Sequence, residues 1–291
     1  WQNSDLVVIA ARPAMGRTAC VVSMAKNMGV NVNIPVALFS LEMSNVQLVN
    51  RMIVNVCEIP GEKIKSGRLE SYEWEQLDFK IKELYDAPVY VDDTPRLSVF
   101  ELRTKARRLV REHGIKILII DYLQLMNASG MNFGSREQEV SMISRSLKGL
   151  AKELNIPIIA LSQLNRGVEN RQGAEGKRPQ LADLRESGAI EQDADMVCFI
   201  HRPEYYKITE DERGNSLIGL AEIIVARHRN GATGDVRLRF KSEFAKFMNV
   251  DEDVSIREFS SGMNGDMNGI PPIPPAGNDF LSAGVNNEMP F

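Results

Sequence analysis

The sequence predicts an α/β fold, with a mainly parallel β-sheet flanked by helices and an antiparallel hairpin at one edge. Six short apolar runs alternate along the chain with longer segments of helical periodicity, which is the pattern of a domain with a parallel sheet. The six runs are continuously apolar rather than alternating, as expected of central strands covered on both faces. Two later runs flank the turn-like sequence RNGATG and predict the hairpin.

These runs define the predicted strands. The parallel candidates are DLVVIAA (5–11), IPVALFSL (34–41), PVYVDD (88–93), IKILIIDY (115–122), IPIIALSQ (156–163) and ADMVCFIHR (194–202). The hairpin candidates are GLAEIIVARHRNG (219–231) and GDVRLRFKSEFAKFM (234–248). In the last run Arg237 and Arg239 alternate with apolar residues, so we expect one apolar face on that strand.

Helical periodicity predicts five helices between the strands, at 17–29, 44–56, 71–86, 98–113 and 136–155. The fourth contains the basic run RTKARRLVREHGIK, whose amphipathic spacing favours a solvated face over a nucleic-acid patch. Two Gly-rich polar stretches, 127–135 and 165–180, interrupt the pattern. The second is long enough that we expect either function or disorder there.

Composition indicates one folded domain and a tail. The chain has 291 residues, of which 43% are hydrophobic and 25% charged, which excludes a wholly disordered protein. Its apolar runs are far shorter than the roughly 18 residues of a membrane span, so no membrane contact is expected. Residues 251–291 are rich in Gly, Asn and Pro, with seven acidic residues and one Arg, and predict a disordered acidic tail. Residues 1–250 carry 34 basic and 32 acidic residues, a balance that permits binding to a polyanion.

The three cysteines, Cys20, Cys57 and Cys198, are widely separated and lack CxxC spacing. This pattern argues against a disulfide framework or a zinc site and favours buried free thiols in a cytoplasmic protein. The three histidines also lack metal-ligand spacing. The chain begins with Trp1 rather than Met, so we expect an upstream part to precede it.

A phosphate-binding loop is expected between the first strand and the first helix. ARPAMGRT (11–18) matches the pattern GxxxxGK[ST] except that Ala11 replaces the first Gly and Arg17 replaces the Lys. Backbone N–H groups and the helix N-terminus would face the phosphates, and the hydroxyl of Thr18 would coordinate magnesium. The alternative is an ordinary strand-to-helix turn. The residues expected to hold a nucleotide are Ala14, Met15, Gly16, Arg17, Thr18 and Ala19.

Polar residues at three other strand ends support the phosphate site. Asp121 closes an apolar run, as in a strand that offers a carboxylate to magnesium, although a capping Asp is the simpler interpretation of that residue alone. Glu42 is placed to accept a proton from an attacking water, and Gln163 to sense a γ-phosphate. Because ligands of open parallel sheets bind at the carboxyl ends of the strands, the four ends together predict a site for ATP and Mg²⁺.

Several segments resemble the C-terminal motor domain of the bacterial replicative DNA helicases, the DnaB family. They are FSLEM (39–43), IIDYLQLM (119–126), SRSLKGLAKELNIPIIALSQLNR (144–166), LADLRESGAIEQDAD (181–195) and RHRNG (227–231). The resemblance extends from about Leu6 to Phe247, with the segments in the family's order. It implies a RecA-like P-loop NTPase fold and a homohexameric ring around single-stranded DNA. It also implies that ATP hydrolysis at the subunit interfaces drives translocation and unwinding of the duplex at the fork.

The resemblance assigns roles to the strand-end residues. It makes Glu42 the base that activates water, and Thr18 and Asp121 the magnesium residues. It makes Gln163 the link between the nucleotide state and the DNA loops.

The resemblance also makes Arg229 an arginine finger given to the neighbouring subunit's ATP. The strand period of two independently puts Arg227 and Arg229 on one face, so both cations are expected to reach that site. Cross-strand charge pairing with Glu243 or Asp235 is the alternative.

For DNA, the resemblance points to the segment around Arg185, Glu186 and Gly188, in DLRESG. Backbone N–H groups and one Arg per subunit would hold DNA phosphates without reading the bases. A capped turn, with Asp183 starting a short helix, is the structural alternative and is compatible with DNA binding. Primase and a helicase loader are implied as partners by the family alone.

Two departures from the family affect the expected activity. The family has Lys where this chain has Arg17 and Arg227, and a planar guanidinium cannot replace a compact ammonium against a bridging phosphate oxygen. We therefore predict that ATP binds but that hydrolysis is weakened. The family's N-terminal collar and linker helix do not form part of this sequence, so weaker ring assembly is also expected.

Two alternatives to an active helicase stay open. One is a hydrolysis-impaired ring subunit that binds ATP and encircles single-stranded DNA, suggested by Arg17. The other is a recombinase that forms open filaments on DNA, which the segment DLRESG argues against.

Overall fold

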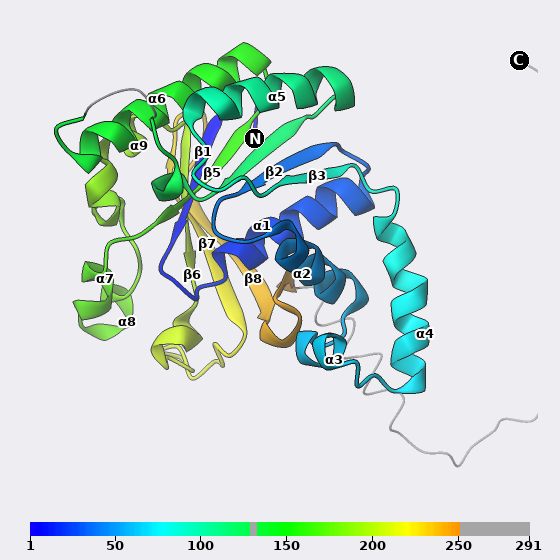
Figure 1. Ribbon diagram of the computed structural model, residues 1–291. Coiled ribbons are helices and arrows are strands. Elements are labelled where there is room, and N and C mark those ends of the chain that lie inside the picture. Colours follow the sequence, from blue (N-terminus) through cyan, green and yellow to red (C-terminus); the bar gives the residue numbers. More distant parts are fainter. Residues whose placement is uncertain (129–132, 251–291) are drawn as a thin grey trace, which may run out of the picture. The chain divides into compact units, whose positions relative to one another are not determined.

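Figure 1 shows the computed structural model of the chain, which describes residues 1–128 and 133–250, with the backbone alone for residues 185–188. The predicted acidic tail, 251–291, and residues 129–132 of the first Gly-rich stretch lie outside the described residues. Within the described residues, no helix is long and apolar enough to cross a membrane.

The described strands form one sheet in the order β3-β2-β4-β5-β1-β6-β7-β8-β9. The first six strands in this order pair in parallel, and the last three join through antiparallel pairings. This topology confirms the predicted mainly parallel sheet with an antiparallel edge. The strands are β1 (Leu6–Ala11), β2 (Val36–Ser40), β3 (Val89–Asp92), β4 (Ile117–Asp121), β5 (Ile158–Gln163), β6 (Met196–His201), β7 (Leu220–His228), β8 (Gly234–Lys241) and β9 (Lys246–Asn249).

Helices cover both faces of the parallel part of the sheet. The longer ones are α1 (Arg17–Lys26), α2 (Asn45–Cys57), α4 (Ser71–Lys80), α5 (Val99–His113) and α6 (Arg136–Leu154). Shorter ones are α3 (Gly61–Ser66), α7 (Gly167–Asn170), α8 (Gly173–Gly176) and α9 (Gly188–Asp193). A π-helical turn, η1 (Asn27–Asn31), and the 3₁₀ turns η2 (Ile81–Leu84), η3 (Leu123–Leu125), η4 (Leu181–Ser187), η5 (Pro203–Tyr206) and η6 (Ser242–Phe244) complete the described elements.

Local sequence explains where the helices begin and end. Ser44, Ser98 and Ser135 cap α2, α5 and α6, each accepting a hydrogen bond from the backbone N–H three residues later. The predicted helices 17–29 and 71–86 correspond to α1 and α4 followed by turns of different pitch, η1 and η2. The short helices α3, α7 and α8 have too few residues to show a helical period.

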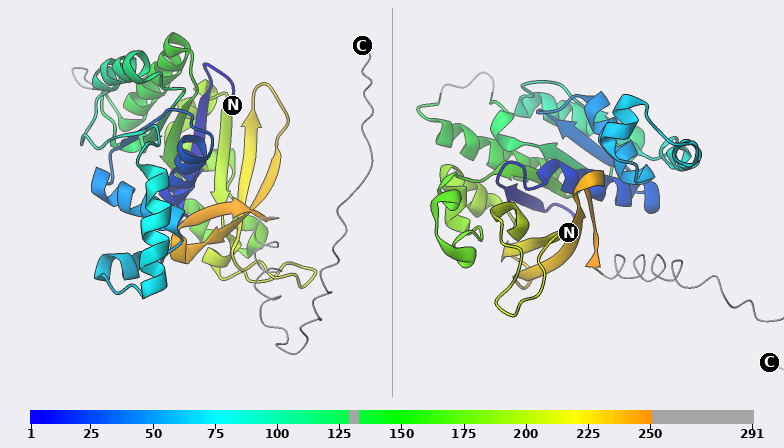
Figure 2. Two further views of the ribbon diagram at one scale, coloured as in Figure 1. Left: turned by 90° about the vertical axis from the view of Figure 1, so that its right-hand side faces the viewer. Right: turned by 90° about the horizontal axis from the view of Figure 1, so that it is seen from below.

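The core has two layers because successive strand residues face opposite sides of the sheet. Val8 and Ala10 of β1 face the layer with Leu102 of α5 and Leu147 of α6. Val7 and Ile9 face the layer formed with α1 and α2. Figures 1 and 2 show α5 and α6 together on one side of the sheet and α1 and α2 on the other. The three cysteines are buried free thiols, as predicted.

The predicted strand 234–248 is wrong as a single strand. It is divided into β8 and β9 by η6 and by Ala245, which has a φ of 46°. This left-handed residue reverses the chain, so β9 pairs antiparallel with β8 instead of extending it. The reversal lets Phe247 donate its N–H to the buried Ser23 of α1, at 3.1 Å. The edge of the sheet is therefore three antiparallel strands, one of them packed against α1.

The end of β6 buries an ionisable group, His201, which is 3% exposed and stacks on Tyr206. Burial, and to a smaller extent Arg178, lower the pKa of His201 to about 4, while Asp235 acts in the opposite direction. Glu222, opposite His201 in the β6–β7 pairing, forms an ion pair with Arg178. The folded protein therefore favours neutral His201.

We expect His201 to contribute to loss of stability in mild acid. Between pH 6.5 and 4 the unfolded chain binds a proton that folded His201 does not, so the free energy of unfolding falls as the pH falls through this window. When the pH falls from 7 to 5, the free energy of unfolding of the wild type should fall by about 2 kcal/mol more than that of His201→Leu. Urea unfolding at both pH values tests this; equal losses in the two proteins would contradict it.

Candidate functional site

The loop between β1 and α1 has the backbone of a phosphate-binding loop. Ala14 and Gly16 both have positive φ, 65° and 93°, and the Met15 side chain is buried. A Cβ on Gly16 would lie 3.2 Å from the ring of Phe247, so the loop needs Gly there for space as well as for conformation. Gly16 gives α1 no side-chain cap, and the amides at the start of this ten-residue helix therefore suit an anion.

Thr18 and Asp121 form the centre of the site. The Thr18 hydroxyl donates to Oδ2 of Asp121 at 2.8 Å, and Asp121 is fully buried at the end of β4. Burial raises the pKa of Asp121, opposed by the nearby Arg17 and by the Thr18 hydrogen bond. Oδ1 of Asp121 is buried without a hydrogen bond. A hydroxyl beside a carboxylate, one of whose oxygens makes an ion pair with Arg17 but no hydrogen bond, fits Mg²⁺, which takes one or two protein oxygens together with phosphates and water.

Arg17 lies between the two carboxylates of the site. One of its terminal nitrogens, Nη2, is 2.8 Å from Glu42 Oε2, and its Nε is 3.4 Å from Asp121 Oδ1. The guanidinium carbon lies 4.2 Å from the centre of the Tyr122 ring, a cation–π contact. The side chain is only 11% exposed. In this arrangement the positive charge of Arg17 offsets the negative charges of Glu42 and Asp121.

Glu42 is positioned by the end of β2, beside β4. Ser40 pairs with Asp121 in the strand register, and the N–H of Leu41 donates to the Asp121 carbonyl at 2.7 Å. The Ser40 hydroxyl closes the following turn by bonding both N–H and C=O of Met43. The Glu42 side chain is 51% exposed, so water reaches it. A carboxylate at this place can accept a proton from a water molecule.

Gln163 ends β5 next to the phosphate loop, in register with Ala11. Its backbone N–H donates to the side chain of Gln124, whose amide nitrogen bonds the Ser162 hydroxyl at 2.8 Å. With Tyr122, Gln163 lines a cavity of about 350 Å³ that extends to η4. The structure thus places Gln163 between the phosphate loop and the segment expected to bind DNA, and outside the cluster formed by Arg17.

Arg227 and Arg229 lie near the opposite ends of the strands from the phosphate loop. Because β7 runs antiparallel to β6, Arg227 pairs with Val197 near the start of β6. Arg229 donates its N–H to the Asp195 carbonyl at 2.7 Å, and its guanidinium bonds the Asp195 carboxylate at 3.1 Å and the Gln192 carbonyl. These arginines are several strand residues, roughly 15–20 Å, from their own phosphate loop.

The alternative prediction, that these arginines pair with Glu243 or Asp235, is wrong. Asp235 forms an ion pair with Arg178, and the partner of Arg229 is Asp195. The guanidinium of Arg227 has no hydrogen-bond or ion-pair partner within residues 1–128 and 133–250, although its backbone pairs with Val197. The guanidinium groups of Arg227 and Arg229 are partly exposed and can therefore contact another molecule.

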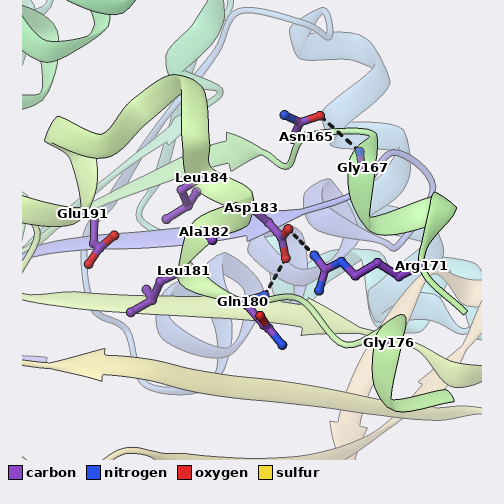
Figure 3. Close-up of a pocket in the computed structure, with 10 residues that line it drawn as sticks. All are labelled: Asn165, Gly167, Arg171, Gly176, Gln180, Leu181, Ala182, Asp183, Leu184 and Glu191. Carbon is purple, nitrogen blue, oxygen red and sulfur yellow. Dashed lines mark hydrogen bonds and ion pairs between the residues drawn. The ribbon is translucent and has the colours of Figure 1, made fainter. Parts of the chain in front are cut away.

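The segment expected to bind DNA spans the end of η4 and the start of α9, where Arg185, Glu186 and Gly188 lie; their side chains are outside the description. Contrary to the prediction, Asp183 does not start a helix but is the third residue of η4. Its carboxylate accepts a hydrogen bond from the N–H of Gln180 at 2.6 Å and forms an ion pair with Arg171. Figure 3 shows these bonds beside a cavity of about 640 Å³. The turn is therefore capped by Asp183, a residue inside η4 rather than one that precedes it.

Sequence reasoning missed three residues that shape the site. Tyr122 supports the Arg17 guanidinium, and Arg12, only 5% exposed, turns inward and bonds Leu164 and Glu169. Arg202 stacks on Phe240, and one of its terminal nitrogens lies 3.4 Å from the Ala14 carbonyl. Arg12 and Tyr122 adjoin motif positions and were visible in the sequence, whereas Arg202 follows β6 and only the fold brings it to the loop.

Comparison with known proteins supports one family. The sequence model of the family described as DnaB-like helicase C terminal domain matches residues 1–249. The chain is similar to the replicative DNA helicase DnaB of Geobacillus stearothermophilus, with 47% identity over 86% of the chain and 54% of that protein. It is similar to the replicative DNA helicase DnaC of Bacillus subtilis, with 46% identity over 86% of the chain and 54% of that protein. The chain thus spans about half the length of these curated relatives.

Solved structures agree with the sequence matches. One, described as an ATPase domain, has a TM-score of 0.79 and 40% identity, covering 86% of each chain. Another, described as a DnaB-like replicative helicase and its interactions with primase, has a TM-score of 0.78 and 41% identity, covering 86% of this chain and 58% of that one. The fold is therefore the RecA-like fold of these ATPase domains, and the chain belongs to the DnaB-like helicase C-terminal domain family.

Proposed function

We propose that this chain is the ATP-driven motor domain of a replicative DNA helicase. In a homohexameric ring it would translocate on single-stranded DNA and unwind the duplex at the fork, in the cytoplasm. One observation carries the proposal: a phosphate loop of the expected backbone places Arg17, Thr18, Asp121 and Glu42 in one cluster, in a chain of the DnaB-like family. Membership of that family weighs against the recombinase alternative.

The nucleotide would bind at the end of β1. Backbone N–H groups from Ala14 to Ala19 and the N-terminus of α1 suit its phosphates. Thr18 and Asp121 would hold Mg²⁺, which when bound supplies positive charge to the phosphate oxygens. Glu42 would take the proton of the attacking water, for which its exposure and its position beside Asp121 are suitable.

Arg17 must change partners for this reaction. In the structure its guanidinium contacts both Glu42 and Asp121, the two carboxylates that water and Mg²⁺ require. Binding of ATP would draw the positive charge toward the phosphates and release both carboxylates. A lysine in this place has no planar group to stack on Tyr122 or to bridge two carboxylates. These contacts of Arg17 are the observation that supports a second candidate function, an ATP-binding ring subunit with impaired hydrolysis.

Arg227 and Arg229 would serve the site of the neighbouring subunit. They lie near the ends of the strands opposite to their own phosphate loop, so they cannot reach their own nucleotide without refolding. Arg229 would exchange Asp195 for a phosphate oxygen, and Asp195 would keep its bonds to Lys148 and to the Leu6 N–H. Cations from an adjacent subunit stabilise the charge of the phosphoryl group in transfer.

The backbone around Arg185, Glu186 and Gly188 would hold DNA phosphates, one copy per subunit. Contacts of this kind carry no sequence information, so weak sequence preference is expected. Primase and a helicase loader are the proposed protein partners. The relative solved with primase supports the first of these.

We expect Arg17→Lys to raise DNA-stimulated ATP hydrolysis by roughly tenfold or more. An ammonium cannot contact Glu42, Asp121 and the Tyr122 ring together as the guanidinium does, and it meets the phosphates as a point charge. Steady-state hydrolysis with and without oligo(dT) measures this. Arg108→Lys, an exposed position of α5, controls for a general effect of the exchange. Equal rates for Arg17→Lys and the wild type would show that Arg17 is not limiting.

Glu42→Gln should lower hydrolysis by about 10²-fold while leaving ATP binding intact, because the amide cannot accept the proton of water. Single-turnover hydrolysis and the Kd of a fluorescent ATP analogue separate the two effects. Glu62→Gln, in α3, is the matched control. If Glu42→Gln hydrolyses ATP at the wild-type rate, Glu42 is not the base.

Arg229→Ala should lower hydrolysis by about 10³-fold without weakening ATP binding. Because the cation is expected in trans, mixing Arg229→Ala with Glu42→Gln should restore part of the activity, since some interfaces then combine an intact Glu42 with an intact Arg229. Hydrolysis by the two variants is measured separately and mixed. No recovery in mixtures that form rings by electron microscopy would place Arg229 outside the neighbour's site.

A further inference from the structure

Arg12 of the phosphate loop makes contacts that neither ATP binding nor hydrolysis explains. Its side chain is 6% exposed and points toward the long Gly-rich stretch 165–180. One terminal nitrogen donates to the Leu164 carbonyl at 2.7 Å, and its Nε donates to Glu169 Oε1 at 2.8 Å. Glu169 lies in α7. A buried guanidinium thus joins the phosphate loop to α7.

A second ion pair continues from α7 to η4. Arg171 directly follows α7 and pairs with the buried Asp183, as Figure 3 shows. Its other terminal nitrogen donates to the Arg178 carbonyl, which holds the Gly-rich stretch together. Arg185, the first residue of the segment proposed to bind DNA, is two positions beyond Asp183.

The backbone provides a parallel connection. The Leu164 carbonyl accepts from Arg12, and the next residue, Asn165, donates its N–H to the Asp183 carbonyl at 3.1 Å. One peptide unit is thus bonded to the phosphate loop on one side and to η4 on the other. The two ends of these contacts, Arg12 and Asp183, are buried, where hydrogen-bonded charges are costly to separate, whereas Glu169 and Arg171 between them are partly exposed.

We propose that Arg12, Glu169, Arg171 and Asp183 form an ion-pair relay that transmits the nucleotide state of the phosphate loop to the DNA-binding segment. Glu169 and Arg171 are positioning residues in this relay. A shift of the phosphate loop moves Arg12, and the two ion pairs carry that movement through α7 to η4. This inference rests on the proposed function and adds a route that does not pass through Gln163.

The relay predicts a loss of coupling with little loss of binding. The test uses the full 291-residue chain and measures the Kd of fluorescent oligo(dT) with ADP and with a non-hydrolysable ATP analogue, so it does not depend on the rate of hydrolysis. The ratio of the two Kd values is the coupling. In Glu169→Ala and Arg171→Ala the coupling should fall about fivefold or more, while the Kd of the ATP analogue without DNA changes by less than about twofold.

Two further variants make the test specific. Glu175→Ala removes an exposed acid from α8, beside the relay, and should keep the wild-type coupling. The double variant Glu169→Ala/Arg171→Ala should lose no more coupling than either single variant, because both residues act in one series. Thermal unfolding of each variant shows that the fold is kept.

The outcomes separate the relay from the proposed function. A wild type that binds neither the ATP analogue nor oligo(dT) would overturn the function and the relay with it. Three results would overturn the relay alone. Glu169→Ala could keep the wild-type coupling, Glu175→Ala could lose as much coupling as Glu169→Ala, or the double variant could lose the sum of the two single losses.

Discussion

The burial of the Asp121 carboxylate is the constraint on which the site depends. A carboxylate without exposure at the end of a central strand requires positive charge or hydrogen-bond donors nearby. The chain supplies both from the phosphate loop, through the Thr18 hydroxyl and the Arg17 guanidinium. Loop, helix α1 and strand β4 are therefore held together by the same group that would meet the metal ion.

This constraint also explains why the identity of residue 17 matters. Any cation there shields Asp121, but a guanidinium is large enough to engage Glu42 as well and flat enough to lie on Tyr122. The structure contains both contacts, and a lysine at residue 17 could not make the contact with Tyr122 in the same way. The proposed exchange of partners by Arg17 when ATP binds therefore follows from the size and planarity of its guanidinium.

The parts of the fold and site that follow from local pattern were predictable. Continuous apolar runs defined β1 to β6, and the rule that parallel strands end at one edge brought Glu42, Asp121 and Thr18 together. The break between β8 and β9 was not predictable, because it depends on Ala245 adopting a left-handed conformation that its residue type does not favour. Helix α7 lies within a Gly-rich stretch, and ion pairs hold it to Arg12 and, through the adjacent Arg171, to Asp183; such pairs leave no period in the sequence. The inward turn of Arg12 is equally a property of the fold.

The antiparallel strands do more than close the edge of the sheet. Phe240 and Phe247 pack against Gly16, and Arg202, stacked on Phe240, bonds the loop at Ala14. Arg227 lies in the neighbouring strand β7 and Arg229 directly follows it, at the end of this antiparallel ribbon that is far from Gly16. In a closed ring, each such β-ribbon would have one end under its own nucleotide and the other in the next subunit's pocket. Under the proposed function, one such ribbon would therefore connect two successive nucleotide sites.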